Sequence, residues 1–168
     1  MADLVTHMAT ALLFKAAAGR KHTASFTLGT VLPDLAGRVP GIVLVKLVGF
    51  GLPIPEGLTH APGVLHMPFG MLPLCVLLAL VFPELQRPKI AANFFGGCML
   101  HMAVDLLQHH TGTGYPLLFP FSNWHFELGW IGTEATVLLA PIIAPVSVLA
   151  WWLRSKWDAK GARGSAEV

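Results

Sequence analysis

The chain has 168 residues, of which 54% are apolar and only 12% are charged. A soluble domain usually carries about 25% charged residues, so this composition excludes intrinsic disorder and argues against a water-soluble globule. The net charge of +2 does not indicate a nucleic-acid partner. We therefore expect an all-α integral membrane protein, surrounded by membrane lipid and with other membrane proteins as candidate partners.

Apolar stretches predict about five membrane helices, of which the first two are shorter than a bilayer requires and are expected to form a hairpin among the longer ones. In chain order they cover residues 4–18, 23–32, 66–82, 90–107 and 134–153. Pro33 and Asp34 are expected to end the second helix, because the residue before a proline avoids the helical region. These helices predict one membrane-embedded domain at residues 1–153, followed by a charged, flexible tail at 154–168.

Residues 39–55 are apolar but are interrupted by prolines and glycines. Such a segment is typical of an interfacial or re-entrant stretch rather than a clean membrane span. Residues 109–133 are rich in glycine and aromatic residues and contain no lysine or arginine, so we expect a loop there.

Lysine and arginine are segregated from histidine along the chain. Basic residues follow the first helix, join the third to the fourth, and follow the last. Because positive charge concentrates on the cytoplasmic side, this pattern predicts a multi-pass protein of the bacterial inner membrane. Six of the eight histidines, together with Asp34 and Asp105, then fall on the non-cytoplasmic face, where Arg38 is the one basic residue.

The strongest local pattern lies on the fourth predicted helix. His101, Asp105 and His109 are spaced four residues apart, which places them on one helix face. Imidazole and carboxylate groups on adjacent turns are common ligands of zinc and similar divalent ions. The simpler interpretation is a helix end at which Asp105 only forms a hydrogen bond. In an apolar segment we favour the metal site, because ionisable groups there are costly unless they have a function.

Further histidine and aspartate residues reach the same predicted face from other segments. His7 opens the first helix, Asp34 follows the second, and His60 and His66 precede or begin the third. Each is unremarkable alone. Their combination at one face predicts a shared metal site or a hydrogen-bonded polar core.

The order of these motifs resembles that of the YdjM-like inner-membrane proteins, a family described as metal-dependent hydrolases. The matching residues are Thr6-His7, Leu32-Pro33-Asp34, Thr59-His60, His101 to Asp105, and Leu117-Leu118-Phe119-Pro120-Phe121-Ser122. The family is in turn distantly similar to zinc-dependent phospholipase C and to single-strand nucleases. The resemblance implies a zinc or other divalent ion and the ligands His7, Asp34, His60, His101 and Asp105.

The chain departs from the family pattern at several positions. Ala36 stands where the family often has a second acid, Pro55-Glu56-Gly57 where it often has His-Arg-Gly, and Ala61 where it often has serine. Glu56, His66 and His109 are candidates to replace the missing groups. The metal site is therefore better supported than catalysis.

Two functions of different classes follow. The first is a membrane-embedded metal-dependent hydrolase of a phosphate ester or phospholipid, with His66 or Glu56 as the general base. The alternative is a non-catalytic membrane protein whose cluster is a structural metal site or polar core, and which serves as a subunit of a larger complex. A transporter is disfavoured because no internal repeat is visible.

Overall fold

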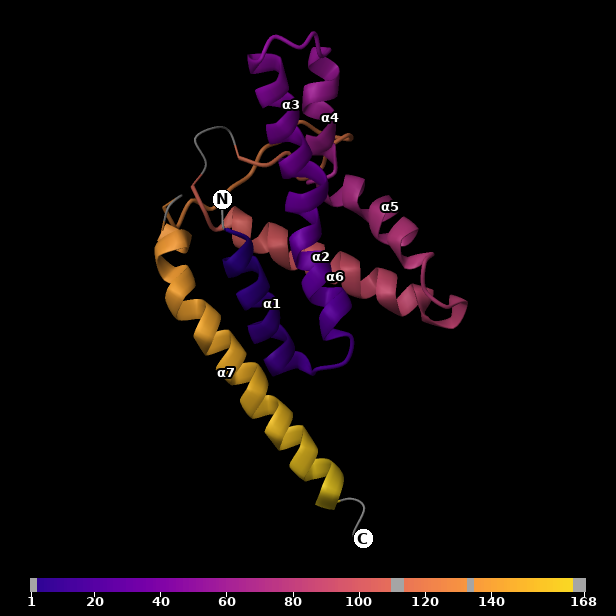
Figure 1. The fold of residues 1–168 in the computed structure, drawn as a ribbon, viewed down its shortest axis with the longest axis vertical. Coiled ribbons are helices and arrows are strands. Elements are labelled where there is room, and N and C mark those ends of the chain that lie inside the picture. Colours follow the sequence, from indigo (N-terminus) through magenta and orange to yellow (C-terminus); the bar gives the residue numbers. More distant parts are fainter. Residues whose placement is uncertain (1–2, 110–113, 133–134, 165–168) are drawn as a thin grey trace.

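The computed structural model of the chain describes residues 3–109, 114–132 and 135–164. Its helices are α1 (Leu4–Ala18), α2 (Thr23–Pro33), the π-helical turn η1 (Asp34–Arg38), α3 (Val39–Gly49), α4 (Glu56–Val64), α5 (Pro68–Ala79), the 3-10 turn η2 (Glu84–Gln86), α6 (Arg87–Leu106) and α7 (Ala135–Gly164) (Figure 1). Within the described ranges there is no strand, only two isolated bridges in the loop after α6. The all-α prediction is confirmed.

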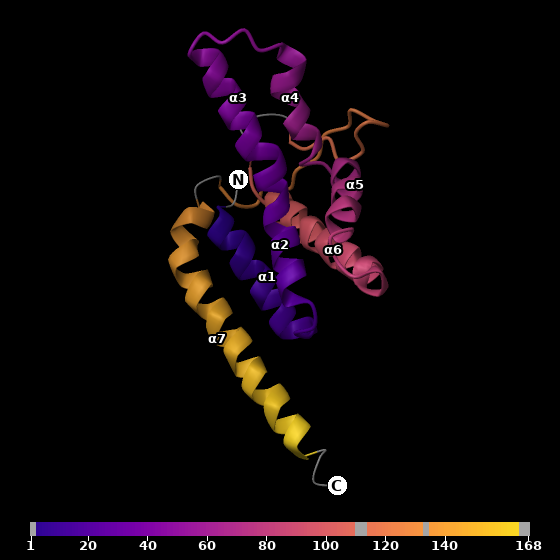
Figure 2. The same ribbon diagram turned by 45° about the vertical axis from the view of Figure 1, so that its right-hand side comes forward.

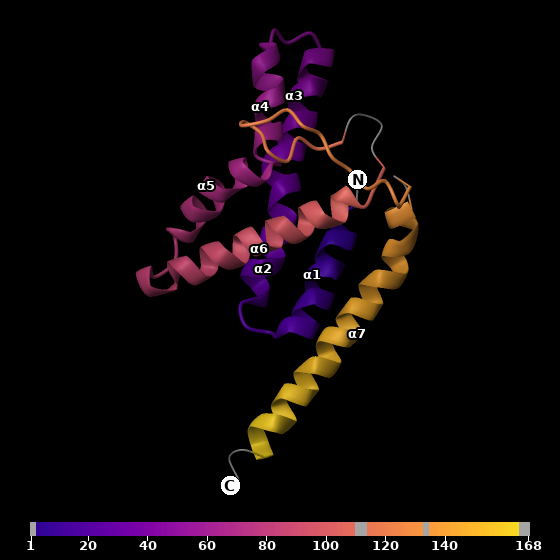
Figure 3. The same ribbon diagram turned by 180° about the vertical axis from the view of Figure 1, so that it is seen from behind.

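The helices pack as a crossed arrangement rather than as a parallel bundle. α1 lies between α2 and α7, while α6 crosses α2 obliquely and also packs against α5 (Figures 1 and 3). α3 and α4 form a hairpin that projects away from the rest of the molecule (Figure 2). The apolar core lies between α2, α5 and α6 and is built around Met71, Cys75, Phe94 and Cys98.

The second helix does not end at Pro33, contrary to the prediction. α2, η1 and α3 follow one another without a break, so the chain stays helical from Thr23 to Gly49. Pro33 has no N–H to donate to the Gly29 carbonyl, and that oxygen instead accepts a hydrogen bond of 3.2 Å from the Cys98 thiol. The helix continues past the proline through an irregular π-helical turn. The Gly29 carbonyl, which lacks its usual helical donor, is hydrogen-bonded by α6 instead.

Glycines allow α2 and α6 to approach to backbone contact. A Cβ atom placed on Gly97 would overlap the Phe26 carbonyl, and one placed on Gly29 would overlap the Phe94 carbonyl. Small residues serve this purpose at helix contacts in membranes. The close crossing holds His101, one turn beyond Gly97, against the backbone of α2.

Most of the predicted membrane helices are too short to span a bilayer. Among the described residues, α7 alone is long and apolar enough to cross a bilayer by itself, over Ala135–Ala159. α4 and α5 meet the criterion only together, and they are bent by 73° at the break between them. The integral bundle of about five helices is therefore not confirmed, although α7 and the α3–α4 hairpin expose many large apolar side chains.

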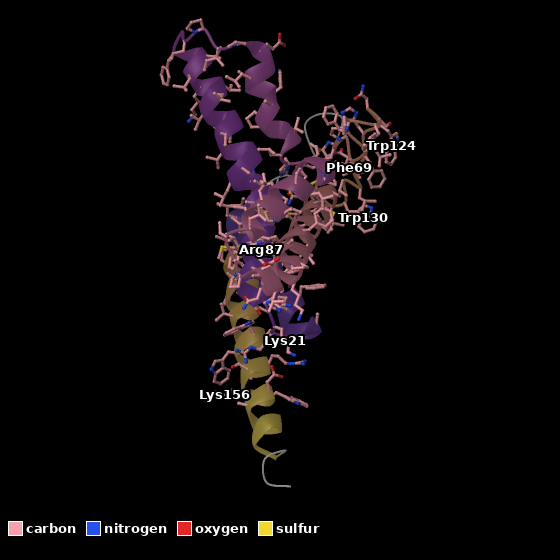
Figure 4. The ribbon with its side chains drawn as sticks, turned by 90° about the vertical axis from the view of Figure 1, so that its right-hand side faces the viewer. Lys21, Phe69, Arg87, Trp124, Trp130 and Lys156 are labelled. Atoms are coloured by element: carbon pink, nitrogen blue, oxygen red, sulfur yellow. The ribbon has the colours of Figure 1, made fainter. Side chains whose placement is uncertain are left out.

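The basic residues are grouped along the long axis of the molecule. Figure 4 places Lys21 and Lys156 toward the C-terminal end of α7, whereas Trp124 and Trp130 lie away from that end. Arg87 lies between them in this view. α7 extends past Leu153, where the sequence predicts the last span to end, and Arg154 pairs with Asp158 at 2.9 Å along it.

Candidate metal centre

α6 supplies two ligand-type side chains from adjacent turns. His101 and Asp105 are both 0% exposed, and His101 Nε2 lies 3.4 Å from Asp105 Oδ2. The four-residue spacing therefore directs both side chains to one buried point, as the sequence predicts.

The backbone of α2 fixes the orientation of the His101 ring. Its Nδ1 lies 2.7 Å from the Thr30 carbonyl oxygen, which can only accept, so Nδ1 carries the proton. The Asp34 N–H bonds to the Val31 carbonyl rather than to that of Thr30, so the irregular end of α2 leaves the Thr30 oxygen for His101. Nε2 then faces the cluster, the arrangement typical of a metal-binding histidine.

α1 places His7 beside these two residues. Asp3 caps the helix by accepting hydrogen bonds of 2.9 Å from both the N–H and the hydroxyl of Thr6. His7 follows directly, with its Nε2 atom 3.3 Å from Asp105 Oδ1 and its ring stacked on His101 at 3.7 Å between centroids.

Asp34 and His66 close the cluster from the opposite side. Asp34 begins η1, and His66 lies in the bend between α4 and α5. His66 Nε2 is 3.0 Å from His101 Nε2 and 3.8 Å from Asp34 Oδ1. A Cβ atom on Gly37 would stand only 2.8 Å from the Pro62 carbonyl and 3.1 Å from His66 Cβ, so glycine is needed there for this bend to approach η1.

These five residues, His7, Asp34, His66, His101 and Asp105, form what we call the His/Asp cluster. Two triads within it, His7–His101–Asp105 and Asp34–His66–His101, have their ligand atoms within 4.8 Å of one another, and every member is buried. His101 belongs to both. A tetrahedral site with bonds of about 2.1 Å needs ligand atoms about 3.4 Å apart.

The donor atoms of the His/Asp cluster fit a cation in chemistry as well as in spacing. Neither ring nitrogen of His7 makes a hydrogen bond of good geometry, and the same holds for Oδ1 of Asp34 and Oδ1 of Asp105. Buried polar atoms are normally satisfied, and a cation held by either triad would satisfy imidazole and carboxylate atoms of this kind. Nitrogen and oxygen donors of this kind suit zinc and related divalent ions.

Tyr115 is a member of the site that the sequence analysis did not identify. Its hydroxyl donates a hydrogen bond of 2.7 Å to Asp105 Oδ2, and its ring stacks on His66 at 5.4 Å. Burial raises the pKa of Tyr115, and the neighbouring Asp105 carboxylate raises it further, so the phenol stays a donor. No spacing in the sequence links this loop residue to α6.

Three residues singled out in the sequence lie elsewhere. The side chains of His60 and Glu56 are 78% and 91% exposed and face each other on α4, with 3.9 Å between His60 Nε2 and Glu56 Oε1. His109 lies beyond the end of α6 with its side chain 65% exposed, and its Nδ1 is 3.1 Å from Glu127. The structure does not bring these side chains into the His/Asp cluster, whereas it brings His66 to its centre.

Comparisons with known proteins identify the family of the chain. The profile of the family described as YdjM inner membrane protein matches residues 1–163, which include every member of the His/Asp cluster. No curated protein and no solved structure matches the chain. Because the profile spans nearly the whole sequence, the chain belongs to the YdjM inner membrane protein family.

Proposed function

We propose that the His/Asp cluster binds a divalent metal ion, with zinc as the first choice, and that the protein is a membrane-embedded metal-dependent hydrolase of phosphate esters. The observation that carries this proposal is the pair of buried triads that share His101. Burying a cluster of this composition without a cation costs free energy, because each metal-ligating atom loses its hydration. We also propose a multi-pass topology with the cluster on the non-cytoplasmic side of the membrane.

His7, His101 and Asp105 are the ligands we assign. The Thr30 carbonyl holds His101 in the tautomer that donates through Nε2, and the Tyr115 hydroxyl orients the Asp105 carboxylate. When bound, the metal ion would lower the pKa of a coordinated water and polarise a phosphoryl oxygen.

His66 is the residue we assign as general base. It lies between the cluster and a cavity, and its imidazole ring would receive a proton from an attacking water. Water adds to phosphorus, the bond from phosphorus to the alcohol oxygen breaks, and the proton held on His66 is passed to the departing alcohol. Asp34, 3.8 Å from His66, stabilises the protonated ring.

Metal analysis and turnover together test the proposal. We expect protein purified in detergent to contain at least one tightly held divalent ion per chain, and to hydrolyse a phosphate ester in a manner that chelators abolish and metal restores. Wild-type protein that retains its metal yet is inert on soluble and lipid phosphate esters would favour the structural alternative. Protein that contains no metal and takes up none would overturn the metal site and leave the cluster as a polar core.

A further inference from the structure

A cavity of about 600 Å³ adjoins the His/Asp cluster and extends away from it along the α3–α4 hairpin. This volume is in the range of small-molecule sites. One wall is the continuous helix through η1 and α3, which contributes residues one turn apart, and the other wall is α4. His66 and Tyr115 line its inner end, where it meets the His/Asp cluster.

The charge in this cavity has one sign. Arg38, Lys46 and two histidines line it, and among its described lining residues there is no aspartate or glutamate. Arg38 lies at the inner end, with its Nη1 atom 3.9 Å from Asp34 Oδ1. Lys46 lies two turns further along the same helix, in which each residue adds about 1.5 Å along the axis. In a chain with only 12% charged residues, this grouping favours an anionic ligand.

Between the two cations the cavity is apolar and open. Ile42 and Val45 line one side, and Gly41 and Gly63 have no heavy atom within 4 Å of a Cβ built on them, so both leave free space. The outer surface of the same hairpin exposes apolar side chains, with Phe50 82% exposed at its tip. Such a hairpin suits contact with hydrocarbon, so a lipid can enter the cavity without crossing water.

We infer that this cavity binds a lipid phosphate: one hydrocarbon chain lies along Gly41 and Gly63, and the phosphate lies beside Arg38, next to His66 and Tyr115. The inference deepens the proposed function and rests on it, because it names the substrate class of the same centre. Arg38 suits this place because its guanidinium can bind two phosphate oxygens at once. Lys46 adds attraction for the anion and can extend its ammonium group to the surface.

Lipid retention measured by native mass spectrometry tests the inference without any turnover. The probes are 1-oleoyl lysophosphatidic acid, 1-oleoyl lysophosphatidylcholine and inorganic phosphate, each added to the full chain carrying Asp105→Asn so that bound lipid is not consumed. We expect one molecule of the lysophosphatidic acid per chain and at least tenfold weaker retention of the choline lipid. Retention of free phosphate as tight as that of the lipid would overturn the role of the hydrocarbon chain.

Matched glycine variants distinguish an effect of filling the cavity from an effect on folding. Gly63→Leu fills the cavity, whereas Gly57→Leu adds the same side chain on the same helix, also into open space, outside the cavity. We expect at least tenfold loss of lysophosphatidic acid for Gly63→Leu and for Arg38→Gln, and none for Gly57→Leu. Gly41→Leu repeats the test from the other wall if Gly63→Leu does not fold.

The outcomes distinguish this inference from the proposed function. Equal retention of lipid phosphate by Gly63→Leu and Gly57→Leu, with Arg38→Gln also unaffected, overturns the lipid site even if the wild-type protein hydrolyses a soluble phosphate ester. Selective retention of lipid phosphate by a protein that never turns it over supports the binding site and contradicts the hydrolase.

Discussion

His101 and Thr30 are joined across the α2–α6 crossing by a hydrogen bond of 2.7 Å between an imidazole Nδ1 and a backbone carbonyl oxygen. The bond fixes which nitrogen of His101 faces the cluster, and it is formed by a part of α2 whose helical hydrogen bonding is disturbed. The geometry of the candidate metal centre therefore depends on backbone irregularity as well as on side chains.

Replacing His101 by alanine should remove metal binding completely. His101 is the residue that both triads share, so its loss leaves neither with three ligands. His7→Ala removes an assigned ligand and should lose most of the metal, whereas His66→Ala leaves His7, His101 and Asp105 in place and should retain it. Elemental analysis after dialysis against a weak chelator gives the comparison. Equal metal content in His101→Ala and wild type would show that the ion is held elsewhere.

His60→Ala and His109→Ala should retain wild-type metal content. Both side chains are largely exposed and lie against acidic residues outside the His/Asp cluster. Exposed pairs of this kind contribute little to stability, so the melting temperature should also be unchanged. The same elemental analysis serves as the measurement. A large loss of metal in His60→Ala would restore the ligand set that the family resemblance implies.

Tyr115→Phe should weaken metal binding by roughly ten- to a hundredfold without abolishing it, the usual effect of removing a partner of a metal ligand. The substitution keeps the ring that stacks on His66 but removes the donor to Asp105 Oδ2. Competition with a chromophoric chelator measures the affinity. An unchanged affinity would mean that Tyr115 serves packing alone.

Gly97→Ala should destabilise the protein by about 1–3 kcal/mol, because its Cβ would overlap the backbone of α2. Gly96→Ala is the matched control, since its Cβ would stand 3.3 Å from the outer edge of the Phe26 ring, which can shift. Thermal unfolding in detergent gives the comparison. Equal melting temperatures for the two variants would contradict the close crossing.

Asp3→Ala should cost about 1 kcal/mol at neutral pH through the loss of the α1 cap. Burial works in the opposite direction, but hydrogen bonds from Thr6 lower the pKa of Asp3 below its ordinary value of 3.8. The ionised carboxylate therefore stabilises the folded state above pH 3.8, and this contribution is lost as the pH falls through the lowered pKa. The stability difference between wild type and Asp3→Ala, measured from pH 7 down to pH 3, should shrink accordingly.

The elements with regular periodicity were predictable from the sequence. The bounds of α1 agree with the expected 4–18, because a capping aspartate precedes it and a glycine follows it. The shared face of His101 and Asp105 follows from helix geometry alone.

The features that depend on bends were not predictable. His60 and His66 are six residues apart, yet only His66 enters the cluster, because the chain turns by 73° between α4 and α5. Passage of the helix through Pro33 depends on partners from α6 that the local sequence does not contain. Tyr115 reaches Asp105 through a loop whose course no periodicity describes.

Pro33 makes α2 less stable but leaves two of its carbonyl groups available to side chains of α6. Pro33→Ala would give residue 33 an N–H for the Gly29 carbonyl and would relieve a helix-interior penalty of about 3 kcal/mol. The residue 33 N–H would then compete with the Cys98 thiol for the Gly29 carbonyl oxygen. In a regular α2 the Thr30 carbonyl would accept a hydrogen bond from within the helix, which would weaken its bond to His101. Selection for a more regular α2 would thus act against the geometry of the candidate metal centre, so the sequence that makes this helix most stable is not the one that holds His101 in place.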